Sequence, residues 1–163
     1  NKIKLMRDHG RGEDGNVSIW GFNSRLDNLQ AAILNFFFED YDKTVKRRRY
    51  IADLYHKGLK DIDELTLPPA TNSNNNHFDI YQNYEIEAER RDELKSFLSD
   101  NGIGTLIQWG GKAVHEFKDL GFTQSLPITE KIMRDSLMLP LNMTVTDVEI
   151  KYICKCIRSF YHD

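Results

Sequence analysis

Asn23 and Arg25 are the two side chains that the sequence places best for binding an anion. They belong to a polar stretch that begins at Gly21 and runs into a long segment of helical periodicity. The first N–H groups of a helix and the positive end of its dipole attract anions, so an amide donor beside them suits a phosphate. Arg25 would add a charge-assisted contact to that anion or to a protein carboxylate. The structural alternative makes Asn23 a turn former and Arg25 an ion-pair partner.

A second group of candidate binding residues surrounds Trp109. An indole ring can stack on a sugar or a base, and the pair Gly110-Gly111 would let the backbone approach a ligand closely. Lys112 would be able to meet a phosphate group, although we favour a solvated lysine. The structural alternatives for the others are a buried tryptophan and a hairpin turn.

Metal binding is not expected. Cys154 and Cys156 lie two residues apart in a segment that reads as helix, so their side chains point to nearly opposite sides and can neither pair nor share a metal. The histidines never occur at the spacing that places two ligands on one helical face. They are His9, His56, His77, His115 and His162.

A helix must begin close to the first group of candidate residues. Ser24 followed three residues later by Asp27 fits a capping pattern. Apolar residues then recur mostly in steps of three and four, which predicts a helix that runs to about Lys57. At 1.5 Å per residue this helix would be about 50 Å long. A compact domain of this size would not cover it, so we expect part of it to pack on a second domain or subunit.

The rest of the chain is predicted to alternate short strands and helices. Alternating burial is indicated from Ile80 to Ala88, Gly102 is a left-handed helix stop, and Thr146 to Glu149 is a capping box. The order strand, helix, strand suggests a two-layer α+β unit. We expect a loop over 68–76, strands over 80–88, 103–109 and 137–140, and helices over 91–101, over 115–119, from 127 and from 146.

Composition limits the possible partners. The chain has 163 residues, 40% of them hydrophobic, and a net charge of -3, so it can bury a core but carries no broad field for nucleic acid or an anionic membrane. No apolar run approaches the roughly 20 residues of a membrane span. We therefore expect a soluble, cytoplasmic protein that binds neither nucleic acid nor membrane. The basic cluster Lys46-Arg47-Arg48-Arg49 is interpreted as a solvated helix face, because successive helical residues fan out around the axis.

Several motifs occur along the chain in a characteristic order. They are Arg7-Asp8-His9-Gly10, the run from Gly21 to Leu34 with its Arg-Leu-Asp-x-Leu-Gln-Ala-Ala, Tyr81 to Tyr84, Arg91 to Leu94, Asn101-Gly102-Ile103, and Leu137 to Pro140. As an ordered set they resemble the DegT/DnrJ/EryC1/StrS family of pyridoxal-phosphate-dependent sugar aminotransferases. The resemblance implies an α+β fold, namely the C-terminal small domain of a fold-type-I aminotransferase, with a small antiparallel sheet and packed helices. It implies a remnant of the large cofactor domain over 1–24, a long linking helix over 25–60, and the small domain over 61–163.

The resemblance also implies a chemistry. Members of the family use pyridoxal phosphate to move an amino group, usually from glutamate, to a nucleotide-linked keto sugar, and they act as homodimers. In the family the position of Asn23 reaches the cofactor phosphate of the neighbouring subunit, which favours the binding role for Asn23. Arg25 is also a candidate for cofactor binding, and both of its interpretations, as an anion-binding residue and as a structural ion-pair partner, stay open. Substrate contacts are implied for Tyr81, Gln108, Trp109 and His115, although Tyr81 taken singly fits an exposed strand tyrosine better.

No catalytic residue is assigned within the chain. In relatives the lysine that forms the imine, and the acid that faces the pyridine nitrogen, precede the Arg7 motif, so the isolated chain is expected to be inactive. The segment Gln108 to Gly111 departs from the common family pattern, which leaves the sugar and its aminated carbon open. Two alternatives remain: a sugar 3-dehydratase of the same family, and a non-catalytic interaction or dimerisation module whose long helix binds a partner.

Overall fold

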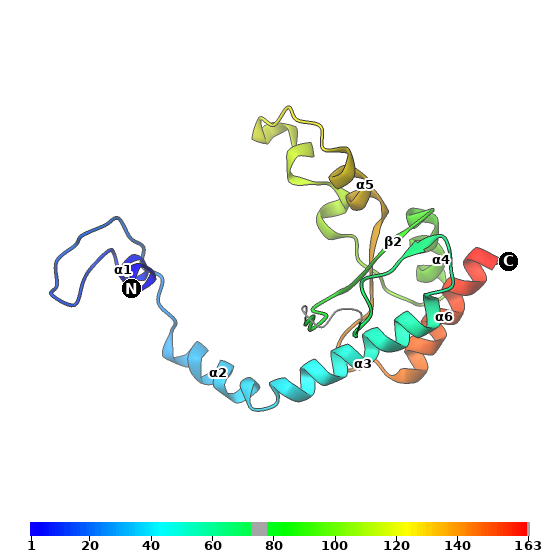
Figure 1. Cartoon of the computed structure of the whole chain (residues 1–163), viewed down its shortest axis with the longest axis horizontal. Helices are drawn as coiled ribbons and strands as arrows, with labels where there is room; N and C mark the ends of the chain where they lie inside the picture. Colours follow the sequence, from blue (N-terminus) through cyan, green and yellow to red (C-terminus); the bar gives the residue numbers. More distant parts are fainter. Residues whose placement is uncertain (73–77, 163) are drawn as a thin grey trace. The chain divides into compact units, whose positions relative to one another are not determined.

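The computed structural model describes residues 1–72 and 78–162 (Figure 1). The chain forms two compact units, Asn1–Asp42 and Lys43–Asp163. The predicted loop over 68–76 falls partly outside the described residues. The division into domains at 24 and 60 remains a prediction.

The first unit contains helices α1 (Lys2–Arg7) and α2 (Asn28–Phe38), joined by a folded loop. Backbone hydrogen bonds tie the loop to α1, because Phe22 N–H donates to the Met6 carbonyl (2.7 Å) and Ser24 N–H donates to the Arg7 carbonyl (2.9 Å). Gly10 lies at φ +78°, where a Cβ would collide with the carbonyl of Ile19, so this turn requires glycine.

The predicted single helix over 25–60 is wrong in two respects. Asp27, not Ser24, caps α2, since its side chain accepts the Leu29 N–H at 2.7 Å. The helix is also interrupted at Glu39 and Asp40, after which α3 (Tyr41–Leu59) begins. Aspartate is a poor residue for a helix interior because its side chain competes for backbone hydrogen bonds, and it favours helix starts for the same reason.

The second unit is built on a three-stranded antiparallel sheet in the order β1 (Leu65–Thr66), β2 (Tyr84–Ala88), β3 (Ser136–Leu139). Buried and partly exposed residues alternate along β2. Its buried face packs on α3, α4 (Arg91–Asp100) and α6 (Asp147–His162), and Figure 1 shows α3 and α6 beside each other. The other face of β2 meets α5 (Pro127–Asp135), where Lys131 Nζ pairs with Glu87 at 3.1 Å. The sheet therefore lies between two helical layers.

The core of this unit contains large side chains from α3, α4 and α6 and from strands β2 and β3. Tyr55 stacks on Tyr84 with ring centroids 4.9 Å apart, and both side chains are almost fully buried. Gly58 allows α3 and α6 to approach closely, because a Cβ there would lie 2.6 Å from Cys154 Sγ. Cys154 and Cys156 are buried free thiols. The fully buried aliphatic residues are Ile51, Leu59, Ile86, Leu94, Leu98, Leu137, Ile150 and Ile157.

Several sequence predictions for this unit are confirmed. Helix α4 ends as expected, with Gly102 at φ +73°. Pro127 opens α5. The capping box before α6 is present, since Thr146 N–H donates to Glu149 Oε2 at 2.7 Å and Glu149 N–H donates to Thr146 Oγ1 at 3.3 Å. These features depend on neighbours in sequence, which is why local patterns reveal them.

Other predictions for this unit are wrong. The strand expected over 103–109 is reduced to one bridge, between Leu106 and Met138, and the helix expected over 115–119 is two short 3-10 turns, Val114–Glu116 and Lys118–Leu120. The strand expected from Ile80 begins only at Tyr84. Tyr81 takes a φ of +51°, which interrupts the extended backbone. It is 3% exposed, so the interpretation as an exposed strand tyrosine is also wrong.

Candidate functional site

Asn23 lies in the first unit on an exposed part of the loop between α1 and α2. Its backbone forms an isolated antiparallel bridge with Asp8, which fixes the position of the loop against the end of α1. The structure records no side-chain contact for Asn23 within the described part of the chain. The amide is thus presented to solvent from a backbone that is held in place.

Arg25 forms an ion pair with Asp8 in the same unit. This hydrogen bond lowers the pKa of the Asp8 carboxyl. The sequence allowed two partners for Arg25, a bound anion or a protein carboxylate. Asp8 is that carboxylate. The two residues also line an open depression of about 700 Å³, together with Lys4, Arg7, Arg11 and the acidic residues Glu13 and Asp14.

The start of α2 is not the anion site that the sequence suggested. Four residues separate Asn23 from the first residue of the helix, and the carboxylate of Asp27 already accepts the Leu29 N–H. A carboxylate at that position would repel a phosphate. Any binding of an anion by Asn23 would rest on its own amide and the loop around it.

Gln108 and Trp109 belong to a tight turn in the second unit, Gln108–Gly111, called the Trp109 turn below. Three successive residues have left-handed backbones, with φ of +51° at Trp109, +65° at Gly110 and +74° at Gly111. The indole is 77% exposed, so the buried alternative is excluded. The turn follows directly on the Leu106–Met138 bridge, whose two N–H groups donate to the opposite carbonyls at 3.2 and 2.9 Å.

His115 is buried, with 8% of its surface exposed. Its Nε2 lies 3.0 Å from Glu130 Oε1, and that oxygen also accepts the Leu126 N–H at 2.7 Å. The bond from His115 is the main cause of a lowered pKa at Glu130. His115 therefore joins the segment after the Trp109 turn to the first turn of α5. A substrate contact for His115 remains a prediction.

Tyr81 is held by the protein on several sides. Its hydroxyl donates to the Pro69 carbonyl at 2.7 Å, and its N–H donates to Asp79 Oδ1 at 2.7 Å. Arg48 Nη1 donates to the carbonyls of Tyr81 (3.2 Å) and Gln82 (2.7 Å). Desolvation by burial raises the pKa of the Tyr81 hydroxyl.

The sheet register separates the predicted substrate residues. Tyr84 pairs with Leu139 and Glu87 with Ser136, so Tyr81 lies beyond the Leu139 end of the sheet. The Leu106–Met138 bridge is antiparallel, which directs Gln108 toward the opposite, Ser136 end. Gln108 and Trp109 thus share one turn, whereas Tyr81 lies at the other end of the strand pair.

The basic cluster is not a solvated face, and that interpretation is wrong for three of its four members. Arg47 donates to Asp147 Oδ1 and to the Val145 carbonyl, both at 2.6 Å. Arg49 donates to the Thr71 carbonyl at 2.6 Å and to the carbonyl of Asp79. With Arg48, these side chains bind three separate segments to α3. The spacing of the arginines could not identify these partners, since all of them lie 22 or more residues away.

No cluster of histidine, cysteine or carboxylate side chains suited to a metal ion occurs among the residues that the structure describes. Over the same residues, no helix is long and apolar enough to cross a membrane.

The motifs, the fold and the exposed Asn23 loop define a class of protein. Residues 1–158 match the DegT/DnrJ/EryC1/StrS aminotransferase family, and the chain belongs to this family. The family is one of pyridoxal-phosphate-dependent sugar aminotransferases. The α+β fold predicted from the sequence is confirmed by solved members of the family.

Individual relatives match almost the whole chain. A "pleiotropic regulatory protein" from Geobacillus stearothermophilus is 32% identical over 165 residues, covering 98% of this chain and 44% of the relative. A dTDP-3-amino-3,4,6-trideoxy-alpha-D-glucose transaminase from Streptomyces venezuelae is 30% identical over 153 residues, covering 86% of this chain and 37% of the relative. The crystal structure of S. venezuelae DesV in complex with a ketimine intermediate superposes with a TM-score of 0.87 at 26% identity, covering 99% of this chain and 44% of that one. The chain spans less than half the length of these relatives.

Proposed function

We propose that this chain is the C-terminal part of a nucleotide-sugar aminotransferase, which moves an amino group from a donor such as glutamate to a keto sugar through pyridoxal phosphate. The observation that carries the proposal is the match over residues 1–158, supported by the TM-score of 0.87 to a protein that binds a ketimine intermediate. The identity of the sugar stays open, because the relatives are named for dTDP-, UDP- and GDP-linked sugars. A sugar dehydratase has no specific support among these relatives.

Asn23 is the residue of this chain proposed to hold the cofactor. Its amide is exposed and its backbone is fixed by the bridge to Asp8, so a donor to a phosphate oxygen is available without rearrangement. We propose that it serves the cofactor of a second subunit in a homodimer. Arg25, engaged by Asp8, holds this loop and adds positive charge near it. When bound, pyridoxal phosphate supplies an electron sink for the carbon that exchanges its amino group.

The imine lysine and the acid facing the pyridine nitrogen are proposed to come from sequence outside these 163 residues. The isolated chain would then neither form the imine nor transfer an amino group. Trp109 is proposed to stack on the sugar or base of the substrate, because its indole is exposed on a turn with a defined backbone. Gln108 lies beside it and would contribute a polar contact. A cytoplasmic location remains a prediction.

Two measurements test the proposal. The chain alone, mixed with pyridoxal phosphate, should show no imine absorbance at about 410 nm and no lysine adduct after borohydride reduction. A second polypeptide, carrying the part of the Geobacillus relative that this chain does not match, should restore the absorbance when added. The assembled protein should then transfer ¹⁵N from labelled glutamate to a dTDP- or UDP-linked keto sugar, as read by mass spectrometry.

Asn23→Ser should weaken retention of the cofactor by the assembled protein. Asn16→Ser is the matched control, because Asn16 is another exposed asparagine of the first unit, and its amide already contacts Asp14 at 2.9 Å. A stoichiometric lysine adduct in the isolated chain would refute the proposed division of the active site. An assembled protein that holds the cofactor but transfers no nitrogen would refute the aminotransferase function.

A further inference from the structure

We infer that Arg91 is a positioning residue, which holds the backbone of the Trp109 turn and so fixes the place from which the exposed indole projects. The relevance of this placement to substrate rests on the proposed function. The proximity of Arg91 to the turn is independent of the proposed function, because both belong to the second unit.

Arg91 is a charged residue buried at a junction. It is the first residue of α4, and its side chain is only 9% exposed. Nη1 donates to the carbonyl of Ser136, the first residue of β3, at 3.0 Å, and lies 3.5 Å from the carbonyl of Met133 near the end of α5. Nε lies 2.7 Å from Asp92 Oδ1, yet its N–H lacks a hydrogen-bond acceptor within the described residues. The guanidinium is thus fixed between three elements.

Gly111, the last residue of the Trp109 turn, faces this guanidinium. A Cβ placed on Gly111 would lie 3.2 Å from Arg91 Nη2 and 3.4 Å from Nη1. These distances are tight for a side chain, and the φ of +74° at Gly111 independently favours glycine. Gly111 therefore lets the turn approach the guanidinium more closely than a residue with a side chain could.

The backbone of Trp109 needs such support. A tryptophan at φ +51° occupies a region that costs free energy for a residue with a bulky side chain, and such conformations persist only when the surroundings fix them. The Leu106–Met138 bridge fixes the turn on its upstream side. Arg91 is the group that fixes it at Gly111. Together they fix the backbone that carries the indole.

Tryptophan fluorescence provides a direct test. The chain has two tryptophans, Trp20 and Trp109, so Trp20→Phe leaves Trp109 as the single emitting residue. In this background the time-resolved anisotropy of Trp109 should show a small amplitude of fast local depolarisation. Arg91→Gln should increase that amplitude, and Arg91→Lys should restore only part of the order, because lysine keeps the charge but lacks the planar group with several donors.

Arg158 supplies the matched control. It also holds two segments together, donating to the Gly58 carbonyl at 2.8 Å and pairing with Asp61, but at a different place in the fold. Arg158→Gln should lower stability and leave the Trp109 anisotropy unchanged. Gly111→Ala, with Arg91 intact, should disturb the anisotropy as Arg91→Gln does. The unfolding midpoint of each variant shows whether it folds.

An unchanged Trp109 anisotropy in folded Arg91→Gln, or an equal change in Arg158→Gln, would overturn the inference. Addition of a dTDP-linked sugar to the assembled protein tests the proposed function separately. Quenching of Trp109 that weakens in Arg91→Gln supports both. If the sugar nucleotide is bound without any change in Trp109 emission, the substrate role of Trp109 fails, whereas the anisotropy result still decides the role of Arg91.

Discussion

The imidazole of His115 and the carboxylate of Glu130 form a contact of 3.0 Å between Nε2 and Oε1, across a loop of 14 intervening residues. The same carboxylate oxygen accepts the N–H of Leu126, just before α5. One glutamate therefore closes the loop and fixes the start of the helix that follows.

Glu130→Gln should destabilise the second unit at neutral pH and should do so less in acid. The pKa of Glu130 is lowered in the folded protein from its ordinary value of 4.5, so the ionised carboxylate contributes stability above that value. This contribution is lost as the pH falls through the folded pKa. Urea unfolding midpoints of the wild type and the variant should therefore differ at about pH 7 and should approach one another as the pH falls below 4.5 and through the folded pKa. Midpoint differences that are independent of pH would show that the carboxylate charge has no part in the effect.

Two core tyrosines should respond oppositely to loss of their hydroxyl groups. The Tyr55 hydroxyl donates to the Pro140 carbonyl at 2.8 Å, so Tyr55→Phe should lower the free energy of unfolding by about 1 kcal/mol. The Tyr84 hydroxyl is buried without a partner in the described structure, so Tyr84→Phe should be neutral or stabilising. Chemical denaturation of both variants provides the comparison. Equal losses would indicate that Tyr84 has a partner, such as a buried water.

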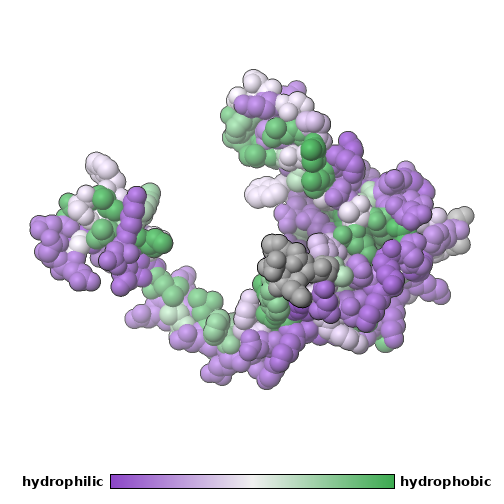
Figure 2. All heavy atoms as spheres, in the orientation of Figure 1, coloured by the Kyte–Doolittle hydropathy of each residue, from purple (hydrophilic) through white to green (hydrophobic). Residues whose placement is uncertain are grey.

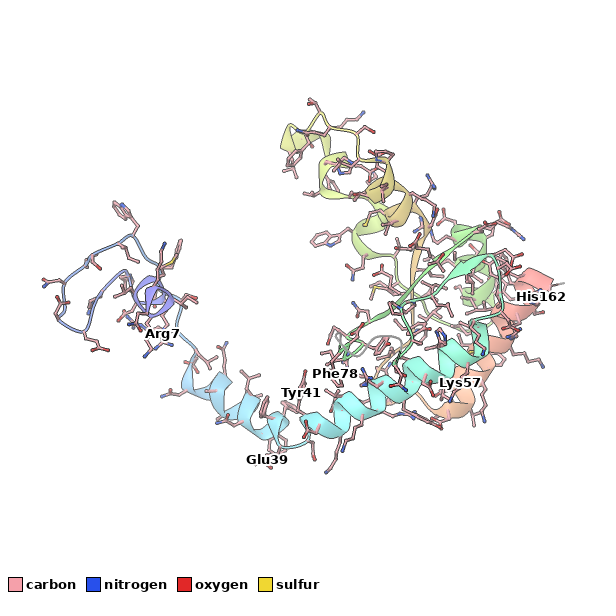
Figure 3. All side chains as sticks on the ribbon, viewed as in Figure 1. Arg7, Glu39, Tyr41, Lys57, Phe78 and His162 are labelled. Carbon is pink, nitrogen blue, oxygen red and sulfur yellow. The ribbon has the colours of Figure 1, made fainter. Side chains whose placement is uncertain are left out.

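Lys46 and Arg49, the two end members of the basic cluster, have different expected effects. Arg49 reaches the carbonyls of Thr71 and Asp79, and its guanidinium lies 4.3 Å from the centroid of the Phe78 ring. Arg49→Lys should cost about 1 kcal/mol, because one ammonium group cannot span both acceptors. Lys46 is exposed, so Lys46→Gln should leave the unfolding midpoint unchanged. Figure 3 shows Phe78 beside α3.

Close packing of α3 on α6 predicts a clash at Gly58. A Cβ there would lie 2.6 Å from Cys154 Sγ, so Gly58→Ala should destabilise by about 1–3 kcal/mol. Adding Cys154→Ala should recover part of the loss. Burial raises the pKa of Cys154 to about 11, so its thiol should react slowly with iodoacetamide in the folded state. Rapid alkylation without unfolding would contradict this packing.

The sequence predicted elements whose signals are local. The Thr146–Glu149 box and the Gly102 stop involve residues three or four apart, and they placed α6 and the end of α4 correctly. The strand predicted over 103–109 is absent because a strand needs a partner along its length, and β3 pairs with this segment only at Leu106.

The same distinction applies to the candidate site. The stacking chemistry of its indole selected Trp109 and the family resemblance selected His115, but no pattern indicated that Glu130 would contact the histidine or that Arg91 would lie close to the turn. These partners come from separate elements, so they become neighbours only when the sheet and its helices assemble. The apolar side chains of α2 in the first unit are exposed, as the green region in Figure 2 shows, and their packing on a second domain or subunit remains a prediction.

The three arginines of α3 donate mostly to main-chain carbonyl oxygens. Arg47 donates to Val145, Arg48 to Tyr81 and Gln82, and Arg49 to Thr71 and Asp79. A carbonyl is present whatever side chain its residue carries. The shape of these loops is thereby uncoupled from most of their sequence, so their side chains can be exchanged without release of the backbone. A single-residue insertion in α3 between Arg49 and Ile51 would have the opposite effect: the buried residues that anchor α3 begin at Ile51, so a rotation of about 100° would turn all three arginines away together.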